Sequence, residues 1–385
     1  MEKKCWIVVS TDNDIIEMIW GSEGVFAMKK ERSAFIDLME CLAIMLVVAY
    51  HGALYPYDHH DTGGGMEYLN YYLRTISATC VPLFFFANGY LLFGKTLDLK
   101  KHVKKTLRLV FLAFFWGGVT LLFLQLVEGG PVSLGTLFSG VWNWEQGKIN
   151  HLWYLGALVC IYVFFPLLKH VFDTNKKYFL YFLIVSAIFT FGNTLLNHLG
   201  TIGLRVLGKA GYWTEFNFFN IFNPFRGIRG YAFVYFCVGG LAYHYRERIE
   251  AISVRKRNIV SVIGILLSCA GLWGLGIFYS GVTGSLWDVV WYGYDTVFTL
   301  ANVVFIYLLC LNWKCDVFVI RMVSCNTLGI FFLHEFIVPV TRTYLRGIPF
   351  LQNIPATILY ALGVIGICTV VSAVMKKIPV VSRLV

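Results

Sequence analysis

The sequence predicts an all-α polytopic membrane protein, a bundle of about ten transmembrane helices. Of its 385 residues, 58% are hydrophobic and only 14% are charged, and the mean hydropathy is +0.67. Soluble domains average about 45–50% apolar and about 25% charged residues. The apolar stretches are long and continuous, whereas the strands of a membrane β-barrel are shorter and alternate in polarity. Composition therefore excludes a soluble domain, and the pattern favours helices.

Ten stretches hold the roughly 20 mostly apolar residues that a membrane-spanning helix needs. In chain order they are Ile36–Tyr55, Leu73–Phe93, Leu107–Val127, Leu152–Phe172, Tyr178–His198, Gly230–Tyr245, Asn258–Tyr279, Val289–Leu311, Cys325–Thr341 and Ala356–Met375. The ten cysteines contain no C-x-x-C pair, and most lie inside these spans. Because buried thiols behave as small hydrophobes, we expect neither a disulfide framework nor a metal site.

The net charge of +10 fits the positive-inside rule better than a nucleic-acid interface. If the segment before the first span is cytoplasmic, the inward-facing segments hold 22 of the 32 basic residues and the outward-facing ones hold eight. We therefore expect both termini in the cytoplasm, no nucleic-acid partner, and a lipid bilayer around the chain.

Residues 1–30 form an N-terminal extension, and residues 31–385 form the membrane domain. The first 27 residues have no long apolar core and so are no signal peptide. A coding sequence for Glu23, Gly24 and Val25 can contain a purine-rich ribosome-binding site shortly before Met28. One hypothesis is that Met28 is the natural start; the other is a native N-terminal tail.

Three ionisable groups lie on the first span: Asp37, Glu40 and His51. At about 100° per residue, Glu40 and His51 point within about 20° of each other and lie about 16 Å apart along the axis. Ionisable residues in a span normally face the bundle interior. Asp37 and Glu40 also suit a helix N-terminus at the headgroups. A buried neutral His51 suits general base catalysis, although a packing histidine is the alternative.

Six segments follow one another in a recognisable order. They are IDLMECLAIMLVVAYHG (residues 36–52), VPLFFFANGYLL (81–92), KKTLRLVFLAFFW (104–116), HLWYLGALVCIYVFFPLL (151–168), SCNTLGIFFLHEFIV (324–338) and KKIPVVSRLV (376–385). Together they resemble the motifs of the integral-membrane acyltransferase family three, over residues 31–385. The ordered set is more specific than any one motif.

The resemblance implies transfer of an acyl group, commonly acetyl, from cytoplasmic acyl-CoA to a hydroxyl of an extracytoplasmic acceptor. Such acceptors are surface polysaccharides or glycolipids, and the enzymes lie in the bacterial cytoplasmic membrane. His51 matches the family's first-span histidine, its usual candidate for the catalytic base. The family pattern has Arg or Lys where this chain has Glu40, so another cation substitutes, or Glu40 acts differently in catalysis, or the activity is altered.

Other polar residues are candidates for binding the donor and the acceptor. Lys104, Lys105 and Arg108 at a predicted cytoplasmic helix entry suit the phosphates of acyl-CoA, or they follow the positive-inside rule. His151 and Trp153 suit a sugar, or they belong to an interfacial aromatic belt. Further candidates for substrate contact are Arg226, with Arg229 near it, and His334. Asp295 and the His334–Glu335 pair are also typical of structural pairing.

A transporter or flippase of a small polar solute or lipid-linked glycan is the alternative function. Transporters favour inverted repeats and helices broken at matching places in two halves. The chain has no convincing internal repeat, and span prolines such as Pro82 and Pro166 are not symmetrically placed. The acyltransferase is therefore the preferred hypothesis.

Overall fold

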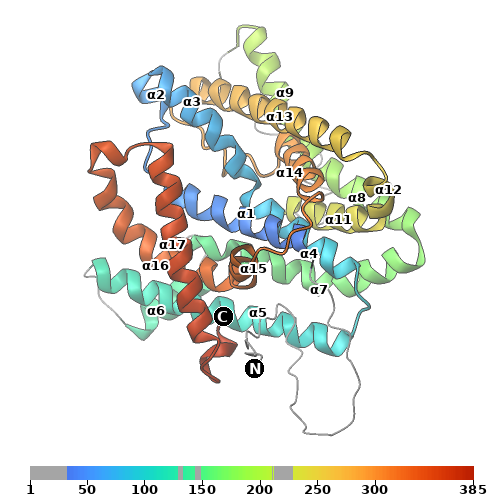
Figure 1. Ribbon diagram of the computed structural model, residues 1–385. Helices are drawn as coiled ribbons and strands as arrows, with labels where there is room; N and C mark the ends of the chain where they lie inside the picture. Colours follow the sequence, from blue (N-terminus) through green and yellow to red (C-terminus); the bar gives the residue numbers. More distant parts are fainter. Residues whose placement is uncertain (1–32, 129–132, 144–148, 210, 212–228) are drawn as a thin grey trace, which may run out of the picture.

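The computed structural model describes residues 33–128, 133–143, 149–209, 211 and 229–385. These residues form helices joined by short turns, and they contain no β-strand (Figure 1). The helices are α1 (Ala34–His51), α2 (His59–Thr62), α3 (Gly65–Arg74), η1 (Thr75–Thr79), α4 (Cys80–Phe93), α5 (Leu99–Glu128), α6 (Leu134–Trp142), η3 (Asn150–Leu152), α7 (Trp153–Thr174), α8 (Lys176–Ala187), η4 (Ile188–Gly192), α9 (Asn193–Val206), α11 (Tyr231–His244), α12 (Arg246–Glu250), α13 (Val254–Thr283), α14 (Val297–Cys310), α15 (Phe318–Cys325), α16 (Thr327–Arg346), η5 (Pro349–Leu351), α17 (Ile354–Met375) and η6 (Val381–Arg383).

The predicted all-α polytopic membrane class is confirmed. In the described residues seven helical segments are long and apolar enough to cross a membrane, and the bent pair α15–α16 makes an eighth. The two remaining predicted spans coincide with α11 and α14, which have 14 residues each. At 1.5 Å per residue such a helix covers about 21 Å, which is less than the roughly 30 Å of a hydrocarbon core.

Helices α4 and α11 pack backbone to backbone at two glycines. A Cβ atom on Gly89 would lie 1.9 Å from the carbonyl oxygen of Phe236, and one on Gly239 would lie 2.1 Å from that of Phe86. Small residues allow such close approach between membrane helices, where packing rather than hydrophobicity drives association. This contact fixes α4, whose first turns contribute to the site described below.

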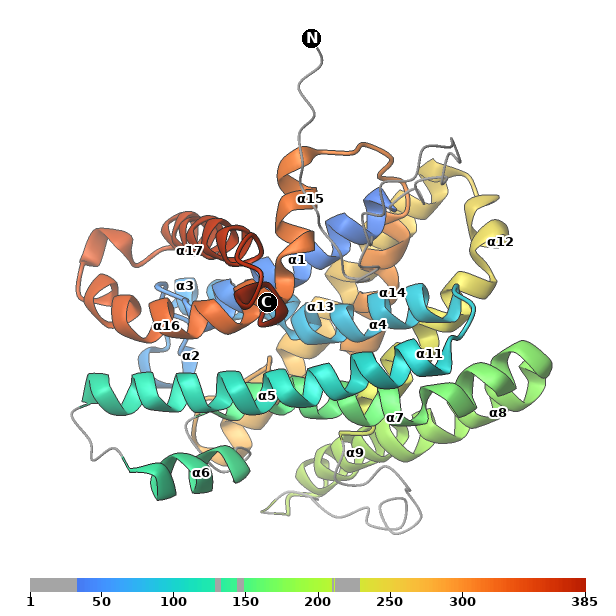
Figure 2. The same cartoon turned by 90° about the horizontal axis from the view of Figure 1, so that it is seen from below.

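Helix α1 lies within the bundle, where it contacts α4, α14, α15, α16 and α17 (Figures 1 and 2). Arginines of α16 bind the end of α1. Arg342 Nη1 donates a hydrogen bond to the carbonyl oxygen of His51 at 2.7 Å, and Arg346 Nε donates to that of Ala53 at 2.8 Å. The last carbonyls of a helix have no partner within it, so these bonds fix His51 relative to α16.

The predicted inward-facing turns meet at one end of the molecule. Lys169 Nζ donates to the carbonyl oxygen of Phe93 at 3.0 Å, and Lys376 Nζ donates to that of Cys325 at 2.7 Å. Arg257 also donates to the side chain of Asn312. Each bond runs from a basic residue of an inward turn, or of the C-terminal tail, to a residue at or near the inward end of another predicted span. The basic segments that alternate with less basic ones along the sequence therefore lie together at one end of the folded chain.

Three of the predicted outward-facing turns meet at the other end. Tyr71 Oη donates to the carbonyl oxygen of Trp287 at 2.6 Å, and Leu54 N donates to Thr357 Oγ1 at 3.0 Å. Arg346 reaches Ala53 in the same region. His51, as the last residue of α1, belongs to this end. Which end faces the cytoplasm stays a prediction of the positive-inside rule.

Labelling of single cysteines tests that orientation. Because most described cysteines are buried and Cys315 is exposed, Cys5 and Cys315 are first replaced by serine. We expect an impermeant maleimide to label Asp61→Cys on intact cells, and to label Asp98→Cys only after permeabilisation. The reverse pattern would contradict the orientation.

Candidate active site

His51 lines a cavity of about 310 Å³, which we call the His51 cavity. The helix that carries it ends at His51, where Gly52 follows and the chain turns away. The side chain of His51 is 37% exposed, because its ring faces this open space. Its backbone carbonyl accepts a hydrogen bond from Arg342, which fixes the point at which the side chain leaves the helix.

Four of the predicted site residues line this one cavity. They are His51 from α1, His151 from η3, Trp153 from the start of α7, and His334 from α16. These residues are up to 283 positions apart in the sequence. The structure therefore brings together the first-span histidine and three of the residues that we expected to contact substrate.

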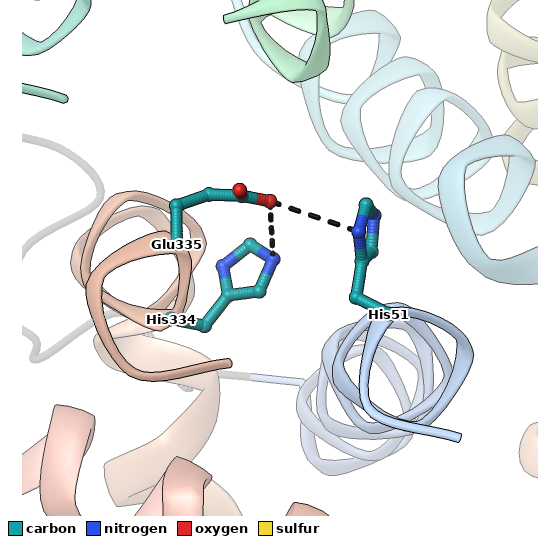
Figure 3. A group of neighbouring side chains, drawn as sticks. All are labelled: His51, His334 and Glu335. Atoms are coloured by element: carbon teal, nitrogen blue, oxygen red, sulfur yellow. Dashed lines mark ion pairs between the residues drawn. The ribbon is translucent and has the colours of Figure 1, made fainter. Parts of the chain in front are cut away.

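The carboxylate of Glu335 lies among the three histidines. Its Oε1 is 3.2 Å from His334 Nε2 and 3.7 Å from His51 Nδ1, and its Oε2 is 4.0 Å from His151 Nδ1. Figure 3 shows the imidazoles of His51 and His334 and the carboxylate of Glu335 directed toward a common point. The side chain of Glu335 is only 14% exposed. The sequence favours structural pairing for His334 and Glu335, but the carboxylate reaches histidines from three segments.

His334 is oriented by its own helix. Its Nδ1 lies 3.1 Å from the carbonyl oxygen of Ile330, one turn earlier in α16. A carbonyl oxygen only accepts hydrogen bonds, so Nδ1 carries a hydrogen atom and Nε2 faces Glu335. This bond, with a side chain that is 1% exposed, holds the ring in one orientation.

One wall of the cavity is aromatic. Trp153 and Trp291 have ring centroids 6.0 Å apart, and the guanidinium carbon of Arg229 lies 4.6 Å from the first ring centroid and 4.8 Å from the second. Arg229 has a φ of 49°, which is unusual for a residue with a side chain. Such strained positions persist where surrounding contacts require them. Arg226, which we expected near the acceptor, lies outside the described residues.

Glu40 lies at the other end of α1, about 16 Å from His51 by helix rise. It is buried, and Ser324 Oγ contacts Glu40 Oε2 at 2.5 Å and Asp37 Oδ1 at 2.8 Å. The expectation that Glu40 faces the bundle interior is confirmed. The hydroxyl of Ser324 thus lies between the two carboxyl groups of α1.

The contact with Ser324 depends on a break between two helices. Helices α15 and α16 meet at an angle of 76° around Asn326. Asn326 Oδ1 accepts a hydrogen bond from Ser372 Oγ at 2.9 Å, and its Nδ2 donates to the carbonyl oxygen of Met322 at 2.7 Å. These bonds satisfy polar groups that a broken helix leaves unpaired. The sequence stretch Cys325–Thr341 had predicted one span here.

The three predicted donor-binding cations lie away from the cavity. None of the described residues that line the His51 cavity is a lysine or an arginine. Arg108 donates to the carbonyl oxygens of Arg383 at 3.3 Å and Val385 at 3.1 Å, and Lys104 is exposed. Lys105 Nζ lies 5.5 Å from the ring centroid of Tyr162. The cation that would substitute for the family's Arg or Lys at Glu40 is therefore not Arg108, and Lys104 and Lys105 stay candidates for that role.

Sequence reasoning missed several residues of the cavity. Glu335 is central to it, while Tyr50, Trp291 and Tyr294 contribute to its lining. The signal for Glu335 was available, because an acidic residue beside a histidine in an apolar span is costly unless it faces other polar groups. Asp295, considered for structural pairing, accepts a hydrogen bond from Thr194 at 2.8 Å, which agrees with that role.

Comparison with known proteins supports the enzyme over the transporter. A family model described as an acyltransferase domain matches residues 33–373. Comparison with curated proteins and with solved structures gives no match. The matched region contains every element that lines the His51 cavity. The chain belongs to acyltransferase family 3 and is an acyltransferase built on membrane-spanning helices.

Proposed function

We propose that this enzyme transfers an acetyl or similar short acyl group from acyl-CoA to a hydroxyl of an extracytoplasmic glycan or cell-envelope acceptor. His51 is the general base. The observation that carries the proposal is the position of His51 in a cavity at the end of the bundle opposite the basic turns, with the Glu335 carboxylate 3.7 Å from its Nδ1.

Glu335 favours the tautomer of His51 that can act as a base. A carboxylate facing Nδ1 favours the tautomer with hydrogen on that atom, which leaves the lone pair of Nε2 for a substrate proton. The same carboxylate stabilises the positive charge that the ring acquires during the reaction, as in other base–carboxylate pairs. Hydrogen bonds of this kind are often long before substrate binds, so 3.7 Å is compatible with the role.

The reaction needs one proton to travel to His51 and back. His51 Nε2 takes the proton of the acceptor hydroxyl while the hydroxyl oxygen attacks the thioester carbonyl. The tetrahedral intermediate collapses, the C–S bond breaks, and the ring returns the proton to the departing thiolate. The products are an ester and free CoA. In this scheme the chemistry needs no metal ion.

The donor enters from the basic end. Lys104 and Lys105 remain suited to the phosphates of acyl-CoA, since Lys104 is exposed and Lys105 is half-buried. Arg108 would join them only after giving up its bonds to the backbone of residues 383–385. The pantetheine arm is long enough to cover most of the roughly 16 Å between Glu40 and His51, so the nucleotide stays on its own side.

The acceptor enters from the other end. Trp153 and Trp291 offer flat apolar faces, and His151 and Asn150 offer polar atoms nearby. Pockets of this kind, mainly aromatic with a few polar groups, fix the orientation of a ligand, and they suit the alternating apolar and hydroxyl faces of a sugar. A surface polysaccharide or glycolipid is therefore the proposed acceptor.

Mass spectrometry of surface polymers tests this function. Cells with and without the gene are compared, and we expect an ester that is lost with the gene and regained on complementation. Identical polymers and envelope lipids in both strains would contradict the proposed acceptor class.

Replacement of His51 by glutamine tests the general base. Glutamine keeps hydrogen-bonding capacity but cannot take up a proton, so we expect His51→Gln to lose transfer by roughly 10²–10⁴-fold. Expression and CoA binding should be largely unchanged. His198→Gln serves as the matched control, because His198 lines a different, apolar cavity. Near-native esterification by His51→Gln would exclude this role.

Replacement of Glu40 by arginine tests the departure from the family pattern. Arginine restores the family's cation, and Asp37 lies one turn away, where it can pair with it. We expect Glu40→Arg to retain or raise the transfer rate, whereas Glu40→Leu, which offers no cation, should lower it. Loss of activity in a well-folded Glu40→Arg protein, with Glu40→Leu unaffected, would show that the cation is not what this position needs.

A further inference from the structure

The contact between His334 and Glu335 places two lone pairs opposite each other. Because His334 Nδ1 carries its hydrogen toward Ile330, Nε2 of the neutral ring has none to offer Glu335 Oε1, 3.2 Å away. Both atoms are buried, and within the described part of the chain neither has a hydrogen-bond partner. Two acceptors this close repel each other unless a positive charge lies near both.

The geometry favours a metal ion over a shared proton as that charge. A shared proton would make these two atoms a hydrogen-bonded pair, and at 3.2 Å they form no hydrogen bond. A third atom, His51 Nδ1, converges on the same point (Figure 3), and the three atoms lie within 4.8 Å of one another. An ion placed beside the line from His334 Nε2 to Glu335 Oε1 would contact both of these atoms and His51 Nδ1.

The set of two imidazoles and one carboxylate suits a first-row divalent ion such as Zn²⁺ rather than Mg²⁺ or Ca²⁺, which prefer oxygen. Tetrahedral zinc at about 2.0–2.1 Å separates its ligands by about 3.4 Å. The 3.2 Å and 3.7 Å distances to Glu335 Oε1 are close to that value. His51 Nδ1 lies within 4.8 Å of the other two atoms, so a small rotation of its ring brings it to coordinating distance.

Neighbouring groups favour the same ion. A histidine that binds a metal usually donates its other ring N–H to a carbonyl or carboxylate, and His334 does so to Ile330. His151 lies close enough to supply a third nitrogen as a fourth ligand, since its Nδ1 is 4.0 Å from Glu335 Oε2 and its side chain is 7% exposed. The ligands come from α1, η3 and α16, which are packed together.

We propose that His51, His334 and Glu335 form a binding site for Zn²⁺ or a similar divalent ion, and that its occupation inhibits the enzyme. A metal on Nδ1 of His51 forces the ring hydrogen onto Nε2 and so removes the lone pair that takes the substrate proton. The metal site stands on the geometry alone; the inhibition rests on the proposed function.

Metal content tests the site without reference to acyl transfer. The full-length protein in detergent is dialysed against ZnCl₂, and bound zinc is measured by mass spectrometry. We expect one ion per chain in the wild type and in His198→Gln, and loss of that ion in His334→Gln and Glu335→Gln. Folding is checked by gel filtration and thermal unfolding, and Co²⁺ absorption in the wild type reports a nitrogen–oxygen site. Absence of stoichiometric zinc in the wild type, or its retention in both variants, overturns the site.

Activity in proteoliposomes tests the inhibition. We expect the rate to fall as Zn²⁺ is added over the range in which the ion binds, and to recover fully with EDTA. Mg²⁺ at the same concentration should have no effect. A rate that is unchanged at full zinc occupancy, or that rises with zinc, overturns the inhibition while leaving the measured site in place. Zinc binding in a protein with no transferase activity would count against the proposed function alone.

Discussion

The carboxylate of Glu335 is the group on which the arrangement of the site depends. A carboxylate that leaves water for a bundle interior loses several kcal/mol of hydration unless polar partners replace it. Here the ring nitrogens that can carry a hydrogen toward it are His51 Nδ1 at 3.7 Å and His151 Nδ1 at 4.0 Å, while His334 Nε2 faces it at 3.2 Å as an acceptor. Because these histidines are distant in sequence, the buried charge is compensated only when α1, η3 and α16 are packed correctly. The same packing creates the cavity in which His51 faces a substrate.

The remaining contacts keep these segments in position. Arg342 binds the last carbonyl of α1, that of His51, at 2.7 Å, and Arg346 binds that of Ala53 just beyond the helix at 2.8 Å. These bonds orient His51 toward Glu335, which lies on the same helix as the arginines. The break at Asn326 separates α15 from α16 by 76°, so Ser324 reaches the acidic start of α1 while α16 continues past its end. Helix α1 is thus held by α15 near Glu40 and by α16 near His51, and the two ends of the proposed reaction path share one rigid element.

The sequence predicted the helices and several residues of the site, because these follow from local features such as apolar stretches and short motifs. Continuous apolar stretches predict helices, and motif order linked His51 with His151, Trp153 and His334. Tertiary packing decided the rest. The start of Cys325–Thr341 contains no glycine or proline, so the sequence does not predict a helix break beside Asn326. The guanidinium of Arg108 is suited to binding phosphate, yet it binds the backbone carbonyls of residues 383 and 385. The role of Glu335 depends on rings from two other segments, so adjacency to His334 was the only local sign of it. Residues 1–30 and Arg226 lie outside the described residues, and expectations about them stay predictions.

A double-mutant cycle between His51 and Glu335 tests most directly whether these two residues act as one unit. Rates of acyl transfer are compared for the wild type, His51→Gln, Glu335→Gln and the double variant, with folding verified for each. Residues that act as a unit show strongly non-additive losses. If Glu335 acts through His51, its replacement slows the wild type substantially but hardly slows a protein that already lacks the base. The double variant should then be about as slow as His51→Gln alone. Losses that multiply in the double variant would contradict the account, because they would mean that Glu335 contributes independently of His51.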